Sequence, residues 1–372
     1  MGELTAVVAI VGAGTMGAGI AQVALEAGDA VRLYDPVADA RKRGRERIAD
    51  GLARRAAKAS VDADSIDEWV AGRLARLDVL DDLEPTSIGA DLVVEAALEE
   101  LAVKRQLFGW LDDLASPDAI LATNTSALRV TDIAAATRRP GRVLGIHFFN
   151  PAPLMALVEV IATGRTDRPT VDRAFALARR WGKTPVRSAD TPGFIVNRVN
   201  RPFTIEALRM LEEGAGTIEE IDAAIVAAGF QMGPFALMDL IGIDINLAAA
   251  RGVYEGFGGD GVPEASRFAP SPIQTRLVDA GQLGRKTGEG FYRYGATGKP
   301  AGPAPAFVAR SGRVRLPSAD ISGRVITAIV AEAGRALADG VATADDIDLA
   351  MKLGARHPFG PFEWVARATI RE

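Results

Sequence analysis

Residues 7–17 read VVAIVGAGTMG. Five apolar residues, Val7–Val11, run directly into Gly12, Gly14 and Gly17 in a G-x-G-x-x-G pattern, and an Ala-rich stretch follows. A buried strand, a tight glycine turn and a helix are the start of a dinucleotide-binding βαβ unit. The glycine pattern alone is weak evidence, and its position between a strand and a helix strengthens it.

A carboxylate ends the next apolar run. Asp35 follows Gly17 by 18 residues, close to the interval at which an acidic side chain binds the adenosine ribose. The glycines, with Thr15 and Met16 among them, predict a pyrophosphate site at the start of the helix. Asp35 would repel a 2′-phosphate, so the sequence predicts NAD, and the basic residues 41–43 leave NADP as an alternative.

Short apolar runs separated by helical stretches continue to about residue 188, which predicts a parallel sheet covered on both faces. The runs are Val7–Val11, Val31–Tyr34, Leu92–Ala96, Ile120–Thr123, Val143–Phe148 and Leu157–Ile161. After the Pro-Gly pair at 192–193, helical periodicity dominates. The sequence therefore predicts an α/β fold, with an N-terminal Rossmann-type, doubly wound parallel sheet followed by an all-helical C-terminal part.

The predicted boundaries divide the chain into four parts. They are an NAD-binding domain at 1–188 with a helical excursion at 37–75, a helical substrate or dimerisation domain at 189–295, a Gly- and Pro-rich linker at 296–320, and a partial second copy of the helical domain at 321–372.

The second copy is visible as an internal repeat. EALRMLEEGAGTIEEIDAAI, from Glu206, recurs 126 residues later as EAGRALADGVATADDIDLAM, from Glu332. Because tethering gives a high effective concentration, we expect residues 321–365 to dock on residues 200–290 of the same chain. The expected state is a monomer with an intramolecular pseudo-dimer, or a homodimer.

Composition excludes several kinds of site and partner. Cys is absent and there are two His, so no metal site is expected. A net charge of −5 provides no general attraction for nucleic acid or an anionic membrane. Residues 4–25 are uncharged, but glycines interrupt them and no basic residue precedes them, so neither a membrane span nor a signal peptide is expected. We therefore expect a cytoplasmic protein.

Polar residues accompany the apolar runs between residues 95 and 197. Ser126 follows one run, His147 lies in another, Glu159 interrupts a third, and Asn197 comes after the Pro-Gly pair. A charged Glu in an apolar strand is costly unless it is paired, so we expect Glu159 to orient His147 as a general base. Structural alternatives stay open: a core histidine, a helix cap at Ser126, a backbone contact at Asn197, and an Arg partner for Glu159.

Seven blocks, taken in order, resemble the L-3-hydroxyacyl-CoA dehydrogenases, also described as 3-hydroxybutyryl-CoA dehydrogenases. They are GAGTMGAGIA, VEAALEELAVK, NTSAL, HFFNPAPLMALVEVI, TPGFIVNR, MGPFALMDLIGID and GRKTGEGFYRY. The resemblance implies an NAD-dependent oxidoreductase that converts an L-3-hydroxyacyl-CoA into the 3-ketoacyl-CoA. Alternatives are the same fold acting on 3-hydroxyadipyl-CoA or on a sugar acid such as L-gulonate, and a non-enzymatic NAD-binding protein.

The resemblance also implies residue roles. His147 is the base and Glu159 its partner, with Ser126 and Asn197 around the substrate oxygens. Five further residues are implied on the cofactor side: Glu99, Lys104, Asn124, Asn150 and Lys286.

Two residues on the helical excursion, Lys58 and Ser60, become candidates for the phosphates of coenzyme A. A solvated helix face is the simpler explanation of the basic residues of that region. His357, in the second copy, is expected to be structural.

Overall fold

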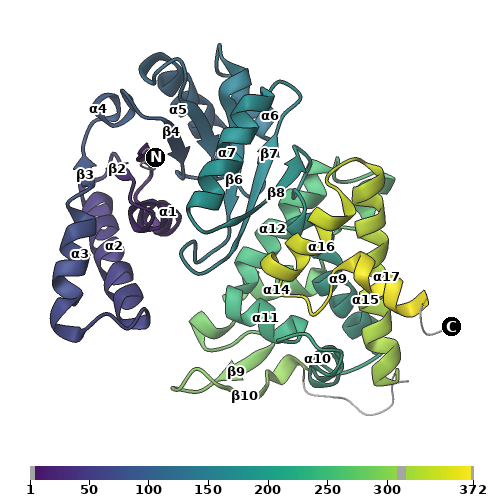
Figure 1. Ribbon diagram of the computed structural model, residues 1–372. Coiled ribbons are helices and arrows are strands. Elements are labelled where there is room, and N and C mark those ends of the chain that lie inside the picture. Colours follow the sequence, from purple (N-terminus) through teal and green to yellow (C-terminus); the bar gives the residue numbers. More distant parts are fainter. Residues whose placement is uncertain (1–4, 308–315, 370–372) are drawn as a thin grey trace. The chain divides into compact units, whose positions relative to one another are not determined.

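The computed structural model describes residues 5–307 and 316–369 (Figure 1). The chain forms two compact units, Met1–Asp190 and Thr191–Glu372. The first ends two residues beyond the predicted NAD-binding domain. The two helical blocks, which the sequence divides into separate domains, belong to one unit because their helices pack against each other.

An eight-stranded sheet forms the centre of the first unit, in the order β3-β2-β1-β4-β5-β6-β7-β8. The strands are β1 Val7–Val11, β2 Ala30–Tyr34, β3 Leu77–Leu80, β4 Leu92–Glu95, β5 Ile120–Thr123, β6 Val143–Phe148, β7 Leu157–Ala162 and β8 Thr184–Ala189. Neighbouring strands are parallel except β6 and β7, which are antiparallel. The predicted Rossmann-type fold is confirmed, and the sheet is parallel apart from the β6–β7 pair.

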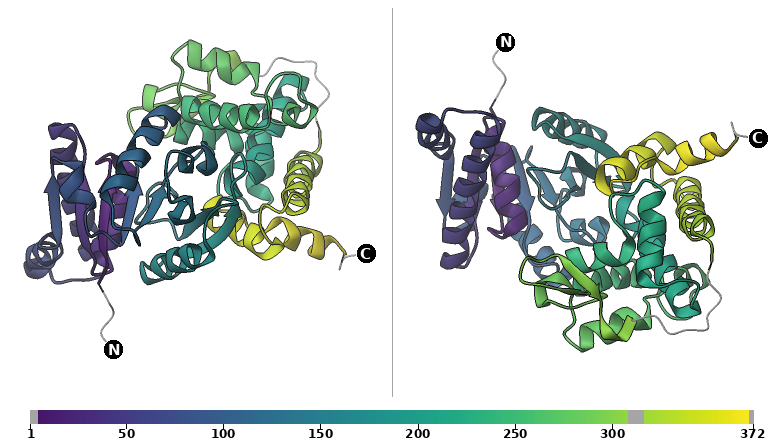
Figure 2. Two further views of the ribbon diagram at one scale, coloured as in Figure 1. Left: turned by 90° about the horizontal axis from the view of Figure 1, so that it is seen from above. Right: turned by 90° about the horizontal axis from the view of Figure 1, so that it is seen from below.

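Helices cover both faces of this sheet (Figure 2). One face carries α1 Thr15–Glu26, α2 Ala38–Lys58, α3 Ile66–Leu74 and α7 Arg168–Arg180, and the other carries α4 Leu83–Ser87, α5 Leu101–Leu114 and α6 Val130–Ala134. Successive strand residues face opposite sides of the sheet. Ile146 packs in the core on the side of α1 and α7, whereas Gly145 lies against Val130 of α6. The predicted excursion at 37–75 consists of α2 and α3.

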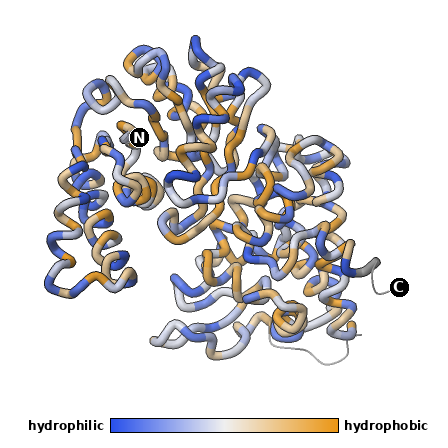
Figure 3. Tube along the Cα trace, viewed as in Figure 1, coloured by the Kyte–Doolittle hydropathy of each residue, from blue (hydrophilic) through white to orange (hydrophobic). Residues whose placement is uncertain are grey.

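The central strands are mainly apolar, with polar residues close to their carboxyl ends (Figure 3). Every residue of β4, β5 and β6 is buried. Burial on both faces explains why these strands are nearly continuous apolar runs in the sequence, with no polar alternation.

The second unit is helical. Its helices are α8 Val196–Val199, α9 Arg201–Glu213, α10 Ile218–Ala227, α11 Pro234–Ile241, α12 Ile243–Gly256, α13 Pro263–Ser266, α14 Pro272–Asp279, α15 Ser318–Ala338, α16 Ala344–Gly354 and α17 Pro361–Thr369. An antiparallel hairpin of β9 Tyr292–Tyr294 and β10 Pro300–Pro303 lies between α14 and α15. β10 falls inside the predicted linker, so part of that stretch is folded.

The second copy of the repeat packs on the first within this unit. α15 contacts α8, α9 and α10, and α16 contacts α8. Arg198 of α8 carries the polar centre of this contact: it lies 2.8 Å from Glu332 and 2.6 Å from Asp339. The side chains of Arg198 and Glu332 are each 1% exposed, so these buried charges need their ion pairs, which for Glu332 include Arg267 at 2.7 Å.

A second set of ion pairs repeats the first with the copies exchanged. Arg324 stands 126 residues after Arg198, and it lies 2.9 Å from Glu206 and 2.5 Å from Glu213. These two carboxylates precede Glu332 and Asp339 by the same 126 residues. Each copy therefore offers one Arg to two acids of the other, which is the reciprocity of an isologous dimer interface.

His357 lies in the same contact. Aromatic rings of Phe203, Phe230 and Trp364 surround it, and its Nε2 lies 2.8 Å from Oδ1 of Asn200. Burial lowers the pKa of His357 to about 3. The imidazole is therefore neutral in the folded protein, with Nε2–H as the donor to Asn200.

This imidazole should make the protein less stable in acid. Between pH 6.5 and pH 3 the unfolded chain binds a proton at His357 that the folded chain does not, so the unfolding free energy falls as the pH falls, by up to about 1.4 kcal/mol per pH unit. We expect His357→Phe to reduce this decrease, measured by urea unfolding at pH 4 and pH 6.5. Asp222, whose pKa burial raises to about 6, titrates in both proteins and cancels from the comparison. An equal fall in unfolding free energy from pH 6.5 to pH 4 in the unmodified protein and in His357→Phe would contradict the prediction.

Candidate active site

His147 and Glu159 face each other across the antiparallel pair β6–β7, where the register makes them direct partners. His147 Nδ1 lies 2.6 Å from Glu159 Oε2, and both side chains are buried. A buried carboxylate beside Nδ1 holds a proton there, which leaves the neutral ring's acceptor lone pair on Nε2. The ring is also packed against Phe149, with centroids 4.6 Å apart. The pairing expected from the sequence is thus present, and the antiparallel return of β7 creates it.

The glycine turn has the geometry that a dinucleotide requires. Gly12 has a φ of 109°, and a Cβ on Gly17 would lie 1.8 Å from the Gly12 carbonyl oxygen, so neither position accepts a side chain. Gly14 caps α1, whose first turn begins with Thr15 and Met16. The exposed amides and dipole of this helix start suit a pyrophosphate.

Asp35 is fixed beside this turn. Its carboxylate accepts hydrogen bonds from the backbone N–H of Ala13 at 2.9 Å and of Val37 at 3.0 Å. The side chain therefore links the end of β2 to the glycine turn, where an adenosine ribose can reach it.

The loop after β5 carries the next predicted residues. Asn124 Oδ1 accepts a hydrogen bond from the Phe148 N–H at 2.9 Å, which ties this loop to the strand of His147. Ser126 donates its N–H to Glu99 at 2.8 Å. Lys104, which the resemblance places on the cofactor side, is 1% exposed and paired with carboxylates. Its ammonium therefore binds protein carboxylates and is not exposed to solvent.

Two predicted residues belong to the helical unit. Asn197 is half-buried on α8. Lys286 forms an ion pair with Asp244 at 2.6 Å, and both side chains are partly exposed. The other predicted residues, including Asn150 in the loop that follows β6, belong to the first unit.

A basic pocket of about 480 Å³ lies between α1, α2 and the loop that follows β6. Pro151, Pro153 and Leu154 form its apolar side. Its cationic side comes from α2, through Arg47, Arg54, Arg55 and Lys58. Ser60 follows the end of α2 and is not part of the lining.

The three arginines were missed from the sequence, although the spacing carries a signal. Residues 47, 51, 54 and 58 share one helix face by their i, i+4, i+7 and i+11 spacing. Gly51 occupies the middle of this face, and a Cβ there would lie 2.0 Å from Gln22 of α1. The glycine lets α2 approach α1, and the cations around it then border the pocket.

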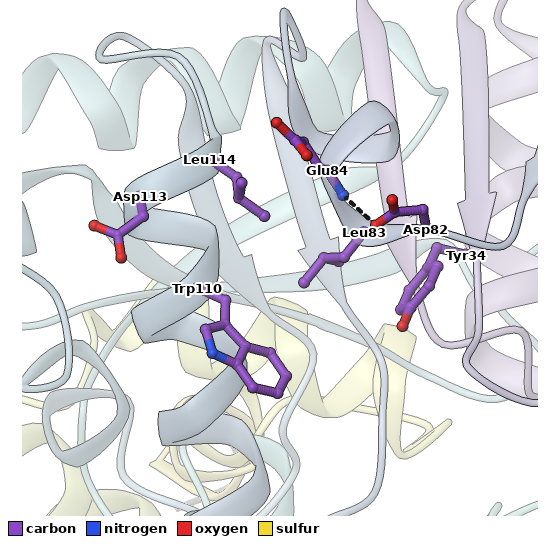
Figure 4. Close-up of a pocket in the computed structure, with 7 residues that line it drawn as sticks. All are labelled: Tyr34, Asp82, Leu83, Glu84, Trp110, Asp113 and Leu114. Carbon is purple, nitrogen blue, oxygen red and sulfur yellow. Dashed lines mark hydrogen bonds between the residues drawn. The ribbon is translucent and has the colours of Figure 1, made fainter.

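A second pocket, of about 320 Å³, has the opposite charge (Figure 4). Tyr34 and Trp110 form its aromatic walls and Leu83 and Leu114 its aliphatic side. Its charged lining residues, Asp82, Glu84 and Asp113, are all acidic, and the carboxylates of Glu84 and Asp113 point outward. Carboxylates repel phosphates, so of these two pockets the basic one suits a phosphorylated ligand.

Two features are absent from the described residues. Residues 5–307 and 316–369 hold no group of three or more acidic or imidazole side chains placed to bind a metal ion. The helices in that same part of the chain include none with the length and apolar character needed to cross a membrane.

The Rossmann-type sheet, the glycine turn and the His147–Glu159 pair define an NAD-dependent dehydrogenase. The NAD-binding domain of 3-hydroxyacyl-CoA dehydrogenase matches residues 7–191, and the C-terminal domain of the same family matches residues 193–294 and 321–371. The chain belongs to the 3-hydroxyacyl-CoA dehydrogenase family, and its cofactor is NAD. The two matches to the C-terminal domain coincide with the internal repeat.

Similar proteins fall into two groups by the share of this chain that they cover. The 3-hydroxyadipyl-CoA dehydrogenase of Escherichia coli K12 is 37% identical over 97% of this chain and 90% of its own length. Mitochondrial hydroxyacyl-coenzyme A dehydrogenase of Rattus norvegicus is 43% identical over 77% of this chain and 90% of its own length. A crystal structure of 3-hydroxybutyryl-CoA dehydrogenase from E. coli K12 superposes with a TM-score of 0.85 at 35% identity, covering 98% of this chain and 92% of that one.

Proposed function

We propose that this enzyme reversibly oxidises an L-3-hydroxyacyl-CoA to the 3-ketoacyl-CoA, with His147 as the general base. The buried His147–Glu159 hydrogen bond of 2.6 Å is the observation that carries the proposal. In this mechanism His147 Nε2 takes the proton of the C3 hydroxyl. Glu159 holds the ring and stabilises the imidazolium that forms.

Bound NAD would supply the hydride acceptor for C3 of the substrate. Ser126 and Asn197 hold the reacting oxygen and the thioester carbonyl, which contributes proximity and orientation. On the cofactor side we propose the glycine turn and Asp35, with Glu99, Asn124 and Asn150 from the first unit and Lys286 from the helical unit. Lys104 acts through its carboxylate partners.

The basic pocket is proposed to bind the phosphates of coenzyme A. Arg47, Arg54, Arg55 and Lys58 supply charge and donors on one side. The apolar side at Pro151 to Leu154 suits the less polar pantetheine arm. Ser60 remains a weaker candidate because it lies beyond the helix end.

A dicarboxylic substrate, 3-hydroxyadipyl-CoA, is the second candidate. The relative with that name is similar over 97% of this chain, including the C-terminal copy. We further propose a monomer in which α15–α17 take the place of a partner subunit. The cytoplasmic location stays a prediction.

An activity panel tests the function. Purified protein is assayed for NADH formation with L-3-hydroxyacyl-CoAs of four to sixteen carbons, 3-hydroxyadipyl-CoA, and L-gulonate. We expect turnover with CoA thioesters and none with the sugar acid. Activity on L-gulonate alone would reject the proposal, as would the absence of turnover with every CoA thioester.

Asp35 should decide the choice of cofactor. Its carboxylate would repel a 2′-phosphate, so kcat/KM should favour NADH over NADPH by at least about tenfold, or about 1.4 kcal/mol. Asp35→Ala should narrow this ratio, chiefly by improving KM for NADPH. Assays of acetoacetyl-CoA reduction with both cofactors measure it. Equal use of both by the unmodified enzyme would refute the role of Asp35.

A further inference from the structure

A closed ring of hydrogen bonds joins β4, β5, α5 and the loop after β5. Lys104 Nζ of α5 lies 2.6 Å from Glu95 Oε1 and 3.2 Å from Glu99 Oε2. Thr123 donates its hydroxyl to Glu95 Oε2 at 2.7 Å, and Thr125 donates its hydroxyl to Glu99 Oε1 at 2.6 Å. The Thr125 N–H, 3.3 Å from Thr123 Oγ1, closes the ring.

Four of these residues are inside the protein. Glu95 and Thr123 are fully buried, and Lys104 and Thr125 are each 1% exposed. The buried Lys104 ammonium thus faces one buried carboxylate, that of Glu95, and one partly exposed carboxylate, that of Glu99. Buried charges are tolerated when they are paired and hydrogen-bonded. Burial raises the pKa of Glu99, but the Lys104 charge and the hydrogen bonds from the loop outweigh it and lower the pKa overall. Glu99 is therefore ionised and a strong acceptor.

The ring ends on the loop that carries Ser126. Besides the Thr125 hydroxyl, Glu99 Oε1 accepts the N–H groups of Ser126 at 2.8 Å and Ala127 at 3.1 Å. The Thr125 hydroxyl in turn accepts the Leu128 N–H at 3.0 Å. A single hydroxyl thus connects the buried ion pairs to both ends of a four-residue turn.

We infer that Thr125 and Glu95 are positioning residues, which hold Ser126 in place for the reaction through the ring with Lys104 and Glu99. The inference rests on the proposed function for the role of Ser126 at the substrate. Small displacements of a group that orients the reacting oxygen lower the rate of the chemical step. The hydroxyl of Thr125 can be removed with little change of shape and no change of charge, and it is the one that also binds the Leu128 N–H of the loop.

The test compares Thr125→Val, which has nearly the same shape without the hydroxyl, with Thr125→Ser, which keeps the hydroxyl. We expect Val to lower kcat about tenfold with KM for NADH within about twofold, and Ser to restore most of kcat. In a Ser126→Ala background, Thr125→Val should have little further effect, because the two residues act together. Two results would overturn the inference. One is a kcat of Thr125→Val within twofold of that of the unmodified enzyme, and the other is a kcat of Thr125→Ser as low as that of Thr125→Val.

Amide hydrogen exchange separates this inference from the proposed function. Thr125→Val should speed exchange at the Ser126 and Ala127 amides, whether or not a CoA thioester is turned over. Glu95→Gln should do the same, because it weakens the contact that holds Lys104 in the ring. If the Ser126 and Ala127 amides exchange faster in the variants but the unmodified enzyme turns over no CoA thioester, the proposed function is rejected. The ring is then still shown to support this loop. Unchanged exchange in both variants would reject the ring.

Discussion

His147→Gln should lower kcat by about 10²-fold or more, the usual contribution of a general base. Gln resembles His in size and can still accept a hydrogen bond, but it cannot hold the substrate proton. NADH affinity should stay nearly unchanged, because the glycine turn and Asp35 are separate from this side chain in the sheet. Steady-state kinetics with acetoacetyl-CoA, and NADH titration followed by fluorescence, measure both quantities.

Glu159→Gln provides the matched comparison. A neutral amide can still hydrogen-bond His147 Nδ1, but it removes the charge that stabilises the imidazolium, so kcat should fall less than in His147→Gln. Near-normal turnover of His147→Gln would mean that another residue is the base. A larger loss in Glu159→Gln than in His147→Gln would mean that the carboxylate does more than orient the ring.

The central strands could be predicted from the sequence because they are buried on both faces. The missed strands β3 and β8 lie at the two edges of the sheet. There the side chains of Asp78 and Arg187 are exposed and break the apolar runs. Edge strands lack a covering neighbour on one side, so hydrophobic continuity does not mark them.

The direction of β7 was predictable from a feature that hydrophobicity does not contain. Eight residues connect Phe148 to Leu157, whereas a parallel crossover needs about a dozen or more. This short loop demands an antiparallel return, and the return sets His147 opposite Glu159. Loop length would therefore have predicted both the strand direction and the pairing.

The argument that singled out Glu159 applies equally to Glu95. Both are charged residues in apolar strands, and both are fully buried beside a cationic or imidazole partner. Lys104 follows Glu95 by nine residues, which gives no pairing signal without the fold. The basic pocket is a similar case, because its apolar wall comes from residues about 100 positions after α2.

Deleting residues 296–372 should convert a monomer into a dimer or an aggregate. Phe203 and Phe230, nearly buried in the intact chain, would lose contact with His357 and Trp364 and expose an apolar face. Arg198 would lose both its carboxylates. Light scattering of intact and truncated protein checks the prediction, and unchanged mass with unchanged solubility after truncation would contradict it.

The reciprocal ion pairs indicate which dimer should form. A second truncated chain offers Glu206 and Glu213, the sequence equivalents of Glu332 and Asp339, at the positions that Arg198 requires. Two such chains can therefore pair through the same face in both directions. Arg198→Glu in the truncated chain would set like charges against each other and should prevent a defined dimer, whereas Arg198→Lys should permit it. A truncated dimer that tolerates Arg198→Glu would use another surface, and the second copy would then not be a substitute for a partner subunit.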